Sequence, residues 1–276
     1  MELLLRKGFW HSGCKHICIF VLLILAGGLQ AKNSSGKHPN VLMIMIDDLN
    51  DCLEGMGGHK QSISPNISEL AASGVFFKQA YTNAPMCGPS RASLFTGIYP
   101  HHSRNFFQAP WFKNEVLNNT RTLMEQFKLA GYQVYGTGKI MHHNQANLWT
   151  HFEHAADYGP SVFNGSERIP HPDVPSPFSD IGWVDGSLGP FIYLAGRKDK
   201  QGNPLSWTTG NGGNIPYKTM HYKNDEDRDP SPDEVNAAWT EKMIAQLSKK
   251  DSEDPFFLSV GFLRLHTPLV APQTYF

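Results

Sequence analysis

The segment that most constrains the fold is "VLMIMIDD", which runs from Val41 to Asp48. Val41 to Ile46 is an unbroken apolar run, which is typical of a strand buried on both faces of a parallel sheet. The run ends in two adjacent acids, Asp47 and Asp48. Such a strand needs other strands beside it and helices above and below it, so the rest of the chain must supply them.

Helix and strand patterns alternate along the chain. Pro65 and Gly74 bracket a short apolar-periodic stretch as a first-turn proline and a C-cap. Thr122 with Glu125, and Ser231 with Glu234, form capping boxes that open two further helices. This alternation predicts an α/β fold with a mostly parallel central sheet and helices on both faces. The expected helices are 64–74, 90–95, 122–131 and 231–249, and the expected strands are 41–46, 75–82, 132–139 and 255–262.

Residues 143–230 differ from this pattern. They are rich in Gly, Pro, Asn, Asp and aromatic residues and show little periodicity. We expect a loop-rich insertion with short elements that shapes the mouth of a pocket.

The N-terminus has the features of a secretion signal. Arg6, Lys7 and Lys15 precede or flank the apolar run 17–28, and small residues follow it. The run has about 12 residues, short of the ~20 that a membrane helix needs. We therefore expect a signal peptide over residues 1–31, entry into the secretory pathway and no stable membrane span. An uncleaved signal anchor is the alternative.

Cysteine and sequon positions agree with a secreted chain. Cleavage would remove Cys14 and Cys18, which leaves Cys52 and Cys87, and these two could pair in an oxidising compartment. The balance of 24 basic and 25 acidic residues gives no electrostatic argument for a nucleic-acid partner. N-x-S/T sequons, which predict a glycoprotein, occur at Asn33, Asn66, Asn118 and Asn164.

Charged side chains follow the predicted strands. Asp47 and Asp48 follow the first strand, Lys139 and His142 follow the strand at 132–139, and His266 follows the last. Ligands of open α/β sheets bind beyond the carboxyl ends of the strands, so these residues predict one shared site. Paired carboxylates favour a hard cation, Ca²⁺ or Mg²⁺, although an ordinary acidic turn is the alternative.

The other residues have alternative interpretations. Lys139 follows a glycine-rich turn and could offer a point charge to an anion or be a solvated lysine. His142 and His143 could be a zinc pair, but no Cys or His at zinc-like spacing supports this. His266 alone could be a hydrogen-bonded structural histidine.

Cys87 belongs to the most specific motif. The segment "PMCGPSRASLFTG", from Pro85 to Gly97, resembles the sulfatase signature with its Cys-x-Pro-x-Arg core. The resemblance implies that a formylglycine-generating enzyme oxidises Cys87 to Cα-formylglycine, in the endoplasmic reticulum or its bacterial equivalent. A packed thiol and a Cys52–Cys87 disulfide are the alternatives.

The resemblance extends to other positions and implies their roles. Asp47 and Asp48 match two metal ligands of the family, with residue 87 as a third and Ca²⁺ as the expected ion, Mg²⁺ less so. Arg91 matches the arginine that steadies formylglycine. Lys139 and His142 match the second motif, with Val134 and Thr137 as departures at packing positions. His266 matches a histidine near the sulfate, and the catalytic residues implied are Cys87, Arg91, Lys139, His142 and His266.

The resemblance also implies fold, substrate and extent. Residues 32–276 resemble the N-terminal part of an alkaline-phosphatase-like sulfatase domain, closest to the iduronate 2-sulfatase branch, with the C-terminal part missing. The implied activity is hydrolysis of sulfate esters of a small molecule or a glycosaminoglycan, in the lysosome or outside the cell. With part of the expected metal ligands absent, we expect this chain alone to be weakly active or inactive. A phosphate or phosphonate monoesterase and a non-catalytic binding protein are the alternatives.

Overall fold

The computed structural model describes residues 38–212, 214–249 and 254–276. Residues 39–276 form one compact unit. The signal peptide predicted over residues 1–31, with Cys14 and Cys18, lies outside the described residues, as does the sequon at Asn33. In the part that is described, no helix combines the length and the apolar character that crossing a membrane requires.

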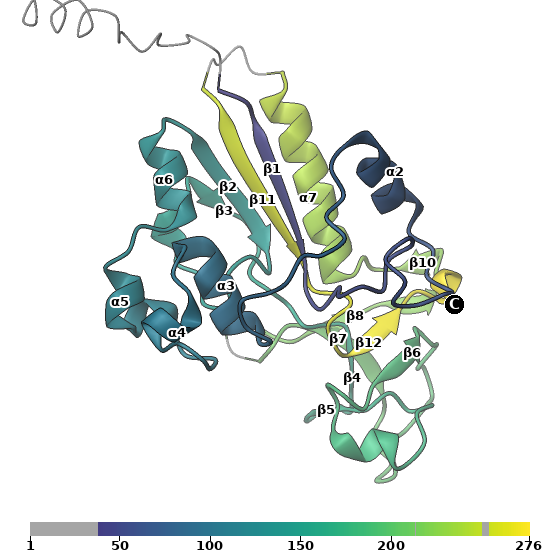
Figure 1. The fold of residues 1–276 in the computed structure, drawn as a ribbon. Coiled ribbons are helices and arrows are strands. Elements are labelled where there is room, and N and C mark those ends of the chain that lie inside the picture. Colours follow the sequence, from purple (N-terminus) through teal and green to yellow (C-terminus); the bar gives the residue numbers. More distant parts are fainter. Residues whose placement is uncertain (1–37, 213, 250–253) are drawn as a thin grey trace, which may run out of the picture. The chain divides into compact units, whose positions relative to one another are not determined.

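A four-stranded parallel sheet forms the centre of the fold (Figure 1). Its spatial order is β1-β11-β2-β3, so the last long strand of the chain lies between two strands from its first half. The predicted strands at 41–46, 132–139 and 255–262 are confirmed within two residues at each end. The strands are β1 (Val41–Ile46), β11 (Phe256–Phe262), β2 (Gln133–Gly138) and β3 (His151–Phe152).

Helices cover both faces of this sheet, as the sequence predicts. Successive residues of a strand point to opposite faces of the sheet, so the contacts of two residues of β2 show which helix covers which face. Val134 packs in the buried cluster that contains Met124 of α6, whereas the Thr137 hydroxyl donates to Asn236 of α7 at 2.7 Å. The helices are α3 (Cys87–Thr96) and α6 (Leu123–Leu129) on one face and α7 (Pro232–Leu247) on the other.

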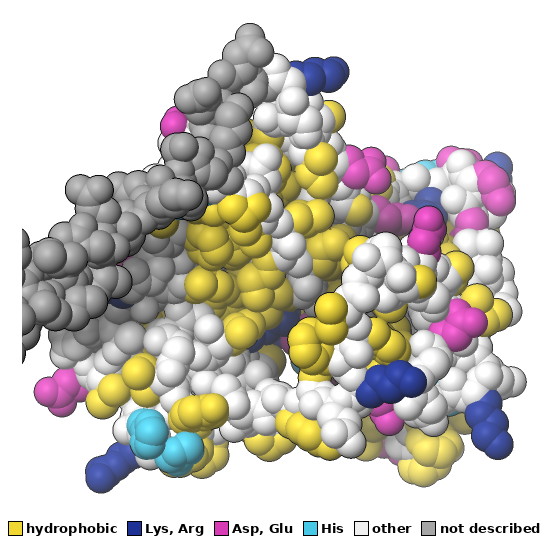
Figure 2. Space-filling model, turned by 45° about the horizontal axis from the view of Figure 1, so that its top comes forward, with side chains coloured by type: hydrophobic (Ala, Val, Ile, Leu, Met, Phe, Trp, Pro, Cys, Tyr) yellow, Lys and Arg dark blue, Asp and Glu magenta, His cyan; other side chains and the backbone are white. Residues whose placement is uncertain are grey.

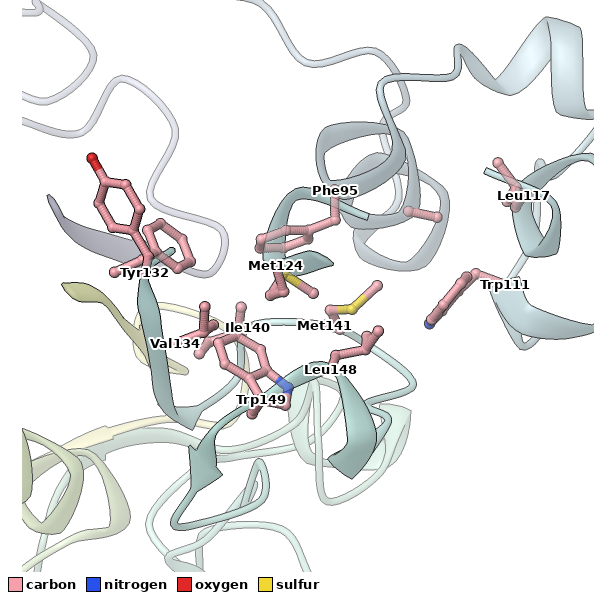
Figure 3. Close-up of a cluster of buried hydrophobic side chains, with 12 residues drawn as sticks. Phe95, Trp111, Leu117, Met124, Tyr132, Val134, Ile140, Met141, Leu148 and Trp149 are labelled. Carbon is pink, nitrogen blue, oxygen red and sulfur yellow. The ribbon is translucent and has the colours of Figure 1, made fainter. Parts of the chain in front are cut away.

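The main hydrophobic core lies on the α3 and α6 face (Figure 3). The Phe127 ring stacks on Phe257 of the central strand, with centroids 4.3 Å apart. Both predicted capping boxes form, at Thr122 for α6 and at Ser231 for α7, and satisfy the first backbone N–H groups of these helices. The fully buried members include Phe95, Leu117, Met124, Val134, Ile140 and Phe257.

One face of β1 remains open, contrary to the prediction of burial on both faces. Leu42 and Ile44 are 45% and 50% exposed, because β1 is an edge strand and α7 contacts β11 and β2. Figure 2 shows hydrophobic side chains gathered as a contiguous group on the surface. The central strand β11 fits the prediction, since only its last residue, Phe262, is partly exposed.

The strand predicted over 75–82 is wrong. These residues follow α2 (Pro65–Ser73), form no strand, and leave Val75, Phe77 and Tyr81 at least 73% exposed. A β-prone run becomes a strand only when another strand pairs with its backbone, and no described strand lies beside it.

Short elements fill residues 143–230 and build a second, antiparallel sheet that the sequence did not predict. Its order is β5-β4-β7-β8, and it has its own buried cluster around Trp207 and Phe191. The strands are β4 (Ser161–Phe163), β5 (Arg168–Ile169), β7 (Ser206–Thr209) and β8 (Lys218–Met220). The remaining elements are α4 (Pro100–Ser103), α5 (Glu115–Asn118), β6 (Leu188–Pro190), β9 (Tyr222–Asn224), β10 (Asp227–Arg228) and β12 (Leu269–Ala271), with short 3₁₀ turns at Trp111–Lys113, Ala146–Leu148, Phe178–Ile181 and Gln273–Tyr275.

Candidate active site

The carboxyl ends of β1, β2 and β11 meet at the candidate site. Two glycines let the strands approach closely there: a Cβ on Gly138 would lie 2.1 Å from the carbonyl oxygen of Gly261, and one on Gly261 would lie 2.0 Å from that of Lys139. The Lys139 backbone N–H donates to the Gly261 carbonyl at 2.8 Å. The side chains of Asp47 and Lys139 are thereby placed next to each other.

Asp47, Arg91 and Lys139 form a buried ionic network. One carboxylate oxygen of Asp47 accepts from Arg91 at 2.9 Å and the other accepts from the Lys139 ammonium. All three residues are at most 5% exposed. Buried charges are tolerated only when they are paired, and one carboxylate here faces two cations. The network therefore carries a net positive charge that suits an anion.

Arg91 also ties α3 to the sheet. Its guanidinium donates to the carbonyl oxygens of Lys139 and Ile140, the latter at 2.6 Å. Burial alone would raise the pKa of Asp47, but the charges of Lys139 and Arg91 outweigh it and lower that pKa. The carboxylate is thus ionised over the whole physiological range.

Cys87 is the first residue of α3, three residues earlier than the predicted start of this helix. The extension occurs because proline is compatible with a first helical turn, and Pro89 lies there. The N-cap, Met86, has no side chain that caps the helix. Position 87 therefore lies beside unsatisfied backbone N–H groups, where negative charge is favoured.

The thiol of Cys87 accepts a hydrogen bond from the Gln108 side chain at 3.0 Å. Gln108 also lies close over Gly88, where an added Cβ would lie 2.2 Å from its amide oxygen. Cys52 and Cys87 are both free thiols, so the structure does not contain the alternative disulfide. Sequence reasoning missed Gln108, and no signal in its surroundings marked it.

An open cavity of about 770 Å³ joins the acidic residues to position 87. Asp48 lies on its rim with its side chain 63% exposed and a positive φ of 56°. The candidate site residues that line this cavity are Asp47, Asp48, Cys87 and Arg91.

His266 lies close to Asp48. Its Nε2 is 3.9 Å from the Asp48 carboxylate, and its Nδ1 contacts the Thr267 carbonyl oxygen at 2.7 Å. Because a carbonyl only accepts, Nδ1 carries the proton and Nε2 faces Asp48.

His142 follows β2 but forms no direct hydrogen bond to the network in the part of the chain described; its partner is His143, with the two Nδ1 atoms 3.4 Å apart. Burial first, then the charges of His143, Lys139 and Arg91, lower the pKa of His142 to about 4. The ring is therefore neutral near pH 7 and able to accept a proton.

Tyr158 is a site residue that sequence reasoning missed. Its hydroxyl accepts from the Lys139 ammonium at 2.6 Å, and its ring meets His266 edge-on with centroids 5.3 Å apart. It lies in the aperiodic segment after β3, where a single tyrosine gives no signal.

The described residues supply hard oxygen donors of the type that Ca²⁺ prefers, but too few of them. Asp47 has both oxygens engaged by Arg91 and Lys139, and Asp48 is the second carboxylate. Within the described ranges, no group of three or more His, Cys, Asp or Glu side chains is placed to hold a metal ion. Six to eight oxygens are usual for Ca²⁺, so these residues do not complete such a site.

Comparisons with known proteins identify the family and the fold of the chain. A sequence model of the sulfatase family matches residues 39–276. A sulfatase of Formosa agariphila is 31% identical over 245 residues, which cover 86% of this chain and 41% of that protein. Human iduronate 2-sulfatase is 30% identical over 257 residues, covering 92% of this chain and 40% of that enzyme. The crystal structure of Ps i-CgsB shares the fold, with a TM-score of 0.52 at 23% identity over 86% of this chain and 47% of that one.

The chain belongs to the sulfatase family, whose alkaline-phosphatase-like α/β fold it has. It spans about two fifths of the length of the curated relatives it matches.

Proposed function

We propose that the protein hydrolyses sulfate esters and that position 87 carries the reacting group as Cα-formylglycine. The observation that carries the proposal is the buried network of Arg91, Lys139 and Asp47, which lies in contact with the cavity that Cys87 lines. Two buried cations around one carboxylate, next to a helix N-terminus, form an environment suited to a sulfate group.

Position 87 would supply the nucleophile. The thiol sulfur in this structure stands in for the oxygens of the modified side chain. If residue 87 is Cα-formylglycine, its hydrate would supply a hydroxyl as the nucleophile for sulfur, with the alcohol as the leaving group. Removal of the proton from its second hydroxyl would then let the C–O bond to sulfate break, which would regenerate the aldehyde. A plain thiol would instead leave a stable thiosulfate-type product.

The surrounding residues would stabilise the negative charge on the sulfate group and transfer protons to and from the reacting oxygens. Arg91 and Lys139 offset the negative charge that grows on the sulfate oxygens, and they are already in place, so little reorganisation is needed. His142, kept neutral by burial, can accept a proton from the spare hydroxyl. His266 would bind sulfate or protonate the leaving oxygen as an imidazolium, whose Nε2–H is free to donate because Nδ1–H donates to the Thr267 carbonyl.

We also propose a divalent cation, Ca²⁺ rather than Mg²⁺, with Asp47, Asp48 and residue 87 among its ligands. Carboxylate oxygens are the donor type that supports this, and the ion would polarise the sulfate. Since the described residues do not complete the site, we expect slow turnover or none from the 276-residue chain alone.

The substrate class proposed is a sulfated small molecule or a glycosaminoglycan, met in the lysosome or outside the cell. Similarity to human iduronate 2-sulfatase, and the secretion signal expected at the N-terminus, support this. Residues 143–230, with their second sheet, would shape the specificity.

The modification of residue 87 is the sharpest test. The chain would be produced in a host that contains a formylglycine-generating enzyme, and the peptide around position 87 would be analysed by mass spectrometry. We expect an aldehyde at 87 and a free thiol at Cys52. An unmodified thiol at 87 throughout would contradict the proposal and favour a non-catalytic sulfatase-fold protein.

Turnover provides the second test. Any activity should require calcium, disappear in Cys87→Ala, persist in the matched control Cys52→Ala, and show a higher kcat/KM for an aryl sulfate than for the corresponding aryl phosphate. A preference for phosphate would favour a phosphomonoesterase instead.

A further inference from the structure

We propose that Tyr158 is a positioning residue of this site, which fixes the ammonium of Lys139 and the ring of His266 in the orientations that a sulfate group requires. The inference rests on the proposed function, since it assigns these two residues to the anion. It concerns contacts that no motif in the sequence indicates.

The first contact fixes Lys139. An ammonium has three N–H donors, and two of them are taken here, by the Tyr158 hydroxyl at 2.6 Å and by Asp47. The ammonium also lies 4.6 Å from the centroid of the Tyr158 ring. Two fixed bonds determine the direction of the third N–H. Without the hydroxyl, the ammonium could rotate about its bond to Asp47.

The second contact fixes His266. The Tyr158 ring meets the imidazole edge-on, at 5.3 Å between centroids and 88° between planes. Together with the bond from Nδ1 to the Thr267 carbonyl, this contact leaves Nε2 facing Asp48. One side chain thus touches residues from the ends of β2 and β11.

Hydrogen bonds from Arg264 fix the backbone of Tyr158. The Arg264 guanidinium donates to the carbonyl oxygens of Tyr158 and Gly159, at 3.0 and 2.8 Å. The backbone N–H of Arg264 donates in turn to Asp233 in the first turn of α7, at 2.8 Å. The loop that carries Tyr158 is therefore tied to the same helix and strand that support the site.

Ordinary packing does not account for this side chain. Tyr158 is only partly buried and belongs to neither of the two hydrophobic clusters. Its polar contact is with a buried lysine, and its ring contact is with a histidine.

The test uses the 276-residue chain matured at position 87, with Tyr158→Phe and Tyr158→Leu. The matched control is Tyr132→Phe, which also removes a tyrosine hydroxyl from a hydrogen bond, to the Pro39 carbonyl at 3.0 Å, away from the site. Tyr158→Phe keeps the ring and its contact with His266, whereas Tyr158→Leu removes both.

The first measurement is the exchange rate of the Lys139 ammonium protons by ¹H–¹⁵N NMR, with the signal assigned by its loss in Lys139→Arg. A lost hydrogen bond to a charged group predicts exchange about tenfold faster in Tyr158→Phe and unchanged in Tyr132→Phe. Equal rates in Tyr158→Phe and the wild type would overturn the proposal.

The second measurement is the dissociation constant for inorganic sulfate. We expect it to rise about fivefold to tenfold in Tyr158→Phe and further in Tyr158→Leu. Unchanged binding in both, with binding lost in Lys139→Ala, would overturn the positioning role. If the wild type binds no sulfate, the proposed function fails, whereas the ammonium exchange rate still decides whether Tyr158 fixes Lys139.

Discussion

The guanidinium of Arg91 lies 2.9 Å from the carboxylate of Asp47 and joins the first half of α3 to the end of β1. The bond connects two segments that are 44 residues apart in the chain. It places the helix that begins at Cys87 against the end of the parallel sheet. Structural support and the charge of the candidate site therefore depend on the same pair.

We expect Arg91→Ala to lower the free energy of unfolding by about 3 kcal/mol, because removing one partner breaks a buried ion pair. It also removes the donors to the Lys139 and Ile140 carbonyls. Urea denaturation measures the change. Arg197→Ala is the control, since its ion pair with Asp173 is exposed and should cost less than about 1 kcal/mol. Equal losses in the two variants would contradict the structural role of Arg91.

Alanine substitutions at two glycines of the site test whether a clash with the backbone destabilises the protein more than a clash with a side chain does. In Gly261→Ala the new Cβ would lie 2.0 Å from the Lys139 carbonyl, a rigid part of the β2–β11 pairing. In Gly88→Ala it would meet the end of the flexible Gln108 side chain at 2.2 Å. We expect Gly261→Ala to destabilise by about 2 kcal/mol or more and Gly88→Ala by less. Thermal denaturation of both variants checks the order, and the reverse order would refute it.

Gln108 should shield the thiol of Cys87 before any modification. Its amide donates to the sulfur at 3.0 Å, and it is the side chain closest to Gly88. We expect Gln108→Ala to react several-fold faster with a soluble disulfide reagent, because the thiol becomes more accessible. Both proteins would carry Cys52→Ala, so that only one thiol is counted. An unchanged rate would mean that Gln108 does not cover the sulfur.

The sequence predicted those parts of the fold whose signals are local. The apolar run 41–46, the capping boxes at Thr122 and Ser231, and the glycine that ends α2 each act within a few residues, and each forms as expected. Burial of a particular strand face depends instead on what lies beside it. Leu42 and Ile44 are apolar like most residues of β11, yet they are exposed. The reason is that β1 is an edge strand, whereas β11 has a strand on each side and α7 packed on it.

The candidate site shows the same difference between local signals, which the sequence reveals, and contacts between distant segments, which it does not. Residues directly after strands could be expected to meet, and Asp47 and Lys139 are in contact, because parallel strands end at one edge. Tyr158 could not be expected, since Arg264, 106 residues away, holds its loop against Lys139. The strand predicted at 75–82 failed for the related reason that pairing is not local.

His171 predicts how stability depends on pH. It is 1% exposed; its Nδ1 accepts from the Asp173 backbone N–H at 3.3 Å, and its Nε2 donates to the Pro190 carbonyl at 3.0 Å, so the native ring is the neutral form. Burial lowers its pKa from the ordinary value of 6.5. The unfolded chain therefore binds this proton more readily, and stability is lost as the pH falls from about 6.5 towards the lowered native value.

We expect the free energy of unfolding to decrease between about pH 7 and about pH 5, and to decrease less in His171→Gln, which has no proton to gain at this position. Urea denaturation at several pH values measures the difference in slope, which does not depend on the absolute stability of the variant. His102→Gln, at an exposed histidine, is the control and should keep the slope of the wild type. If His171→Gln also kept that slope, the buried ring would not be the group that couples folding to pH.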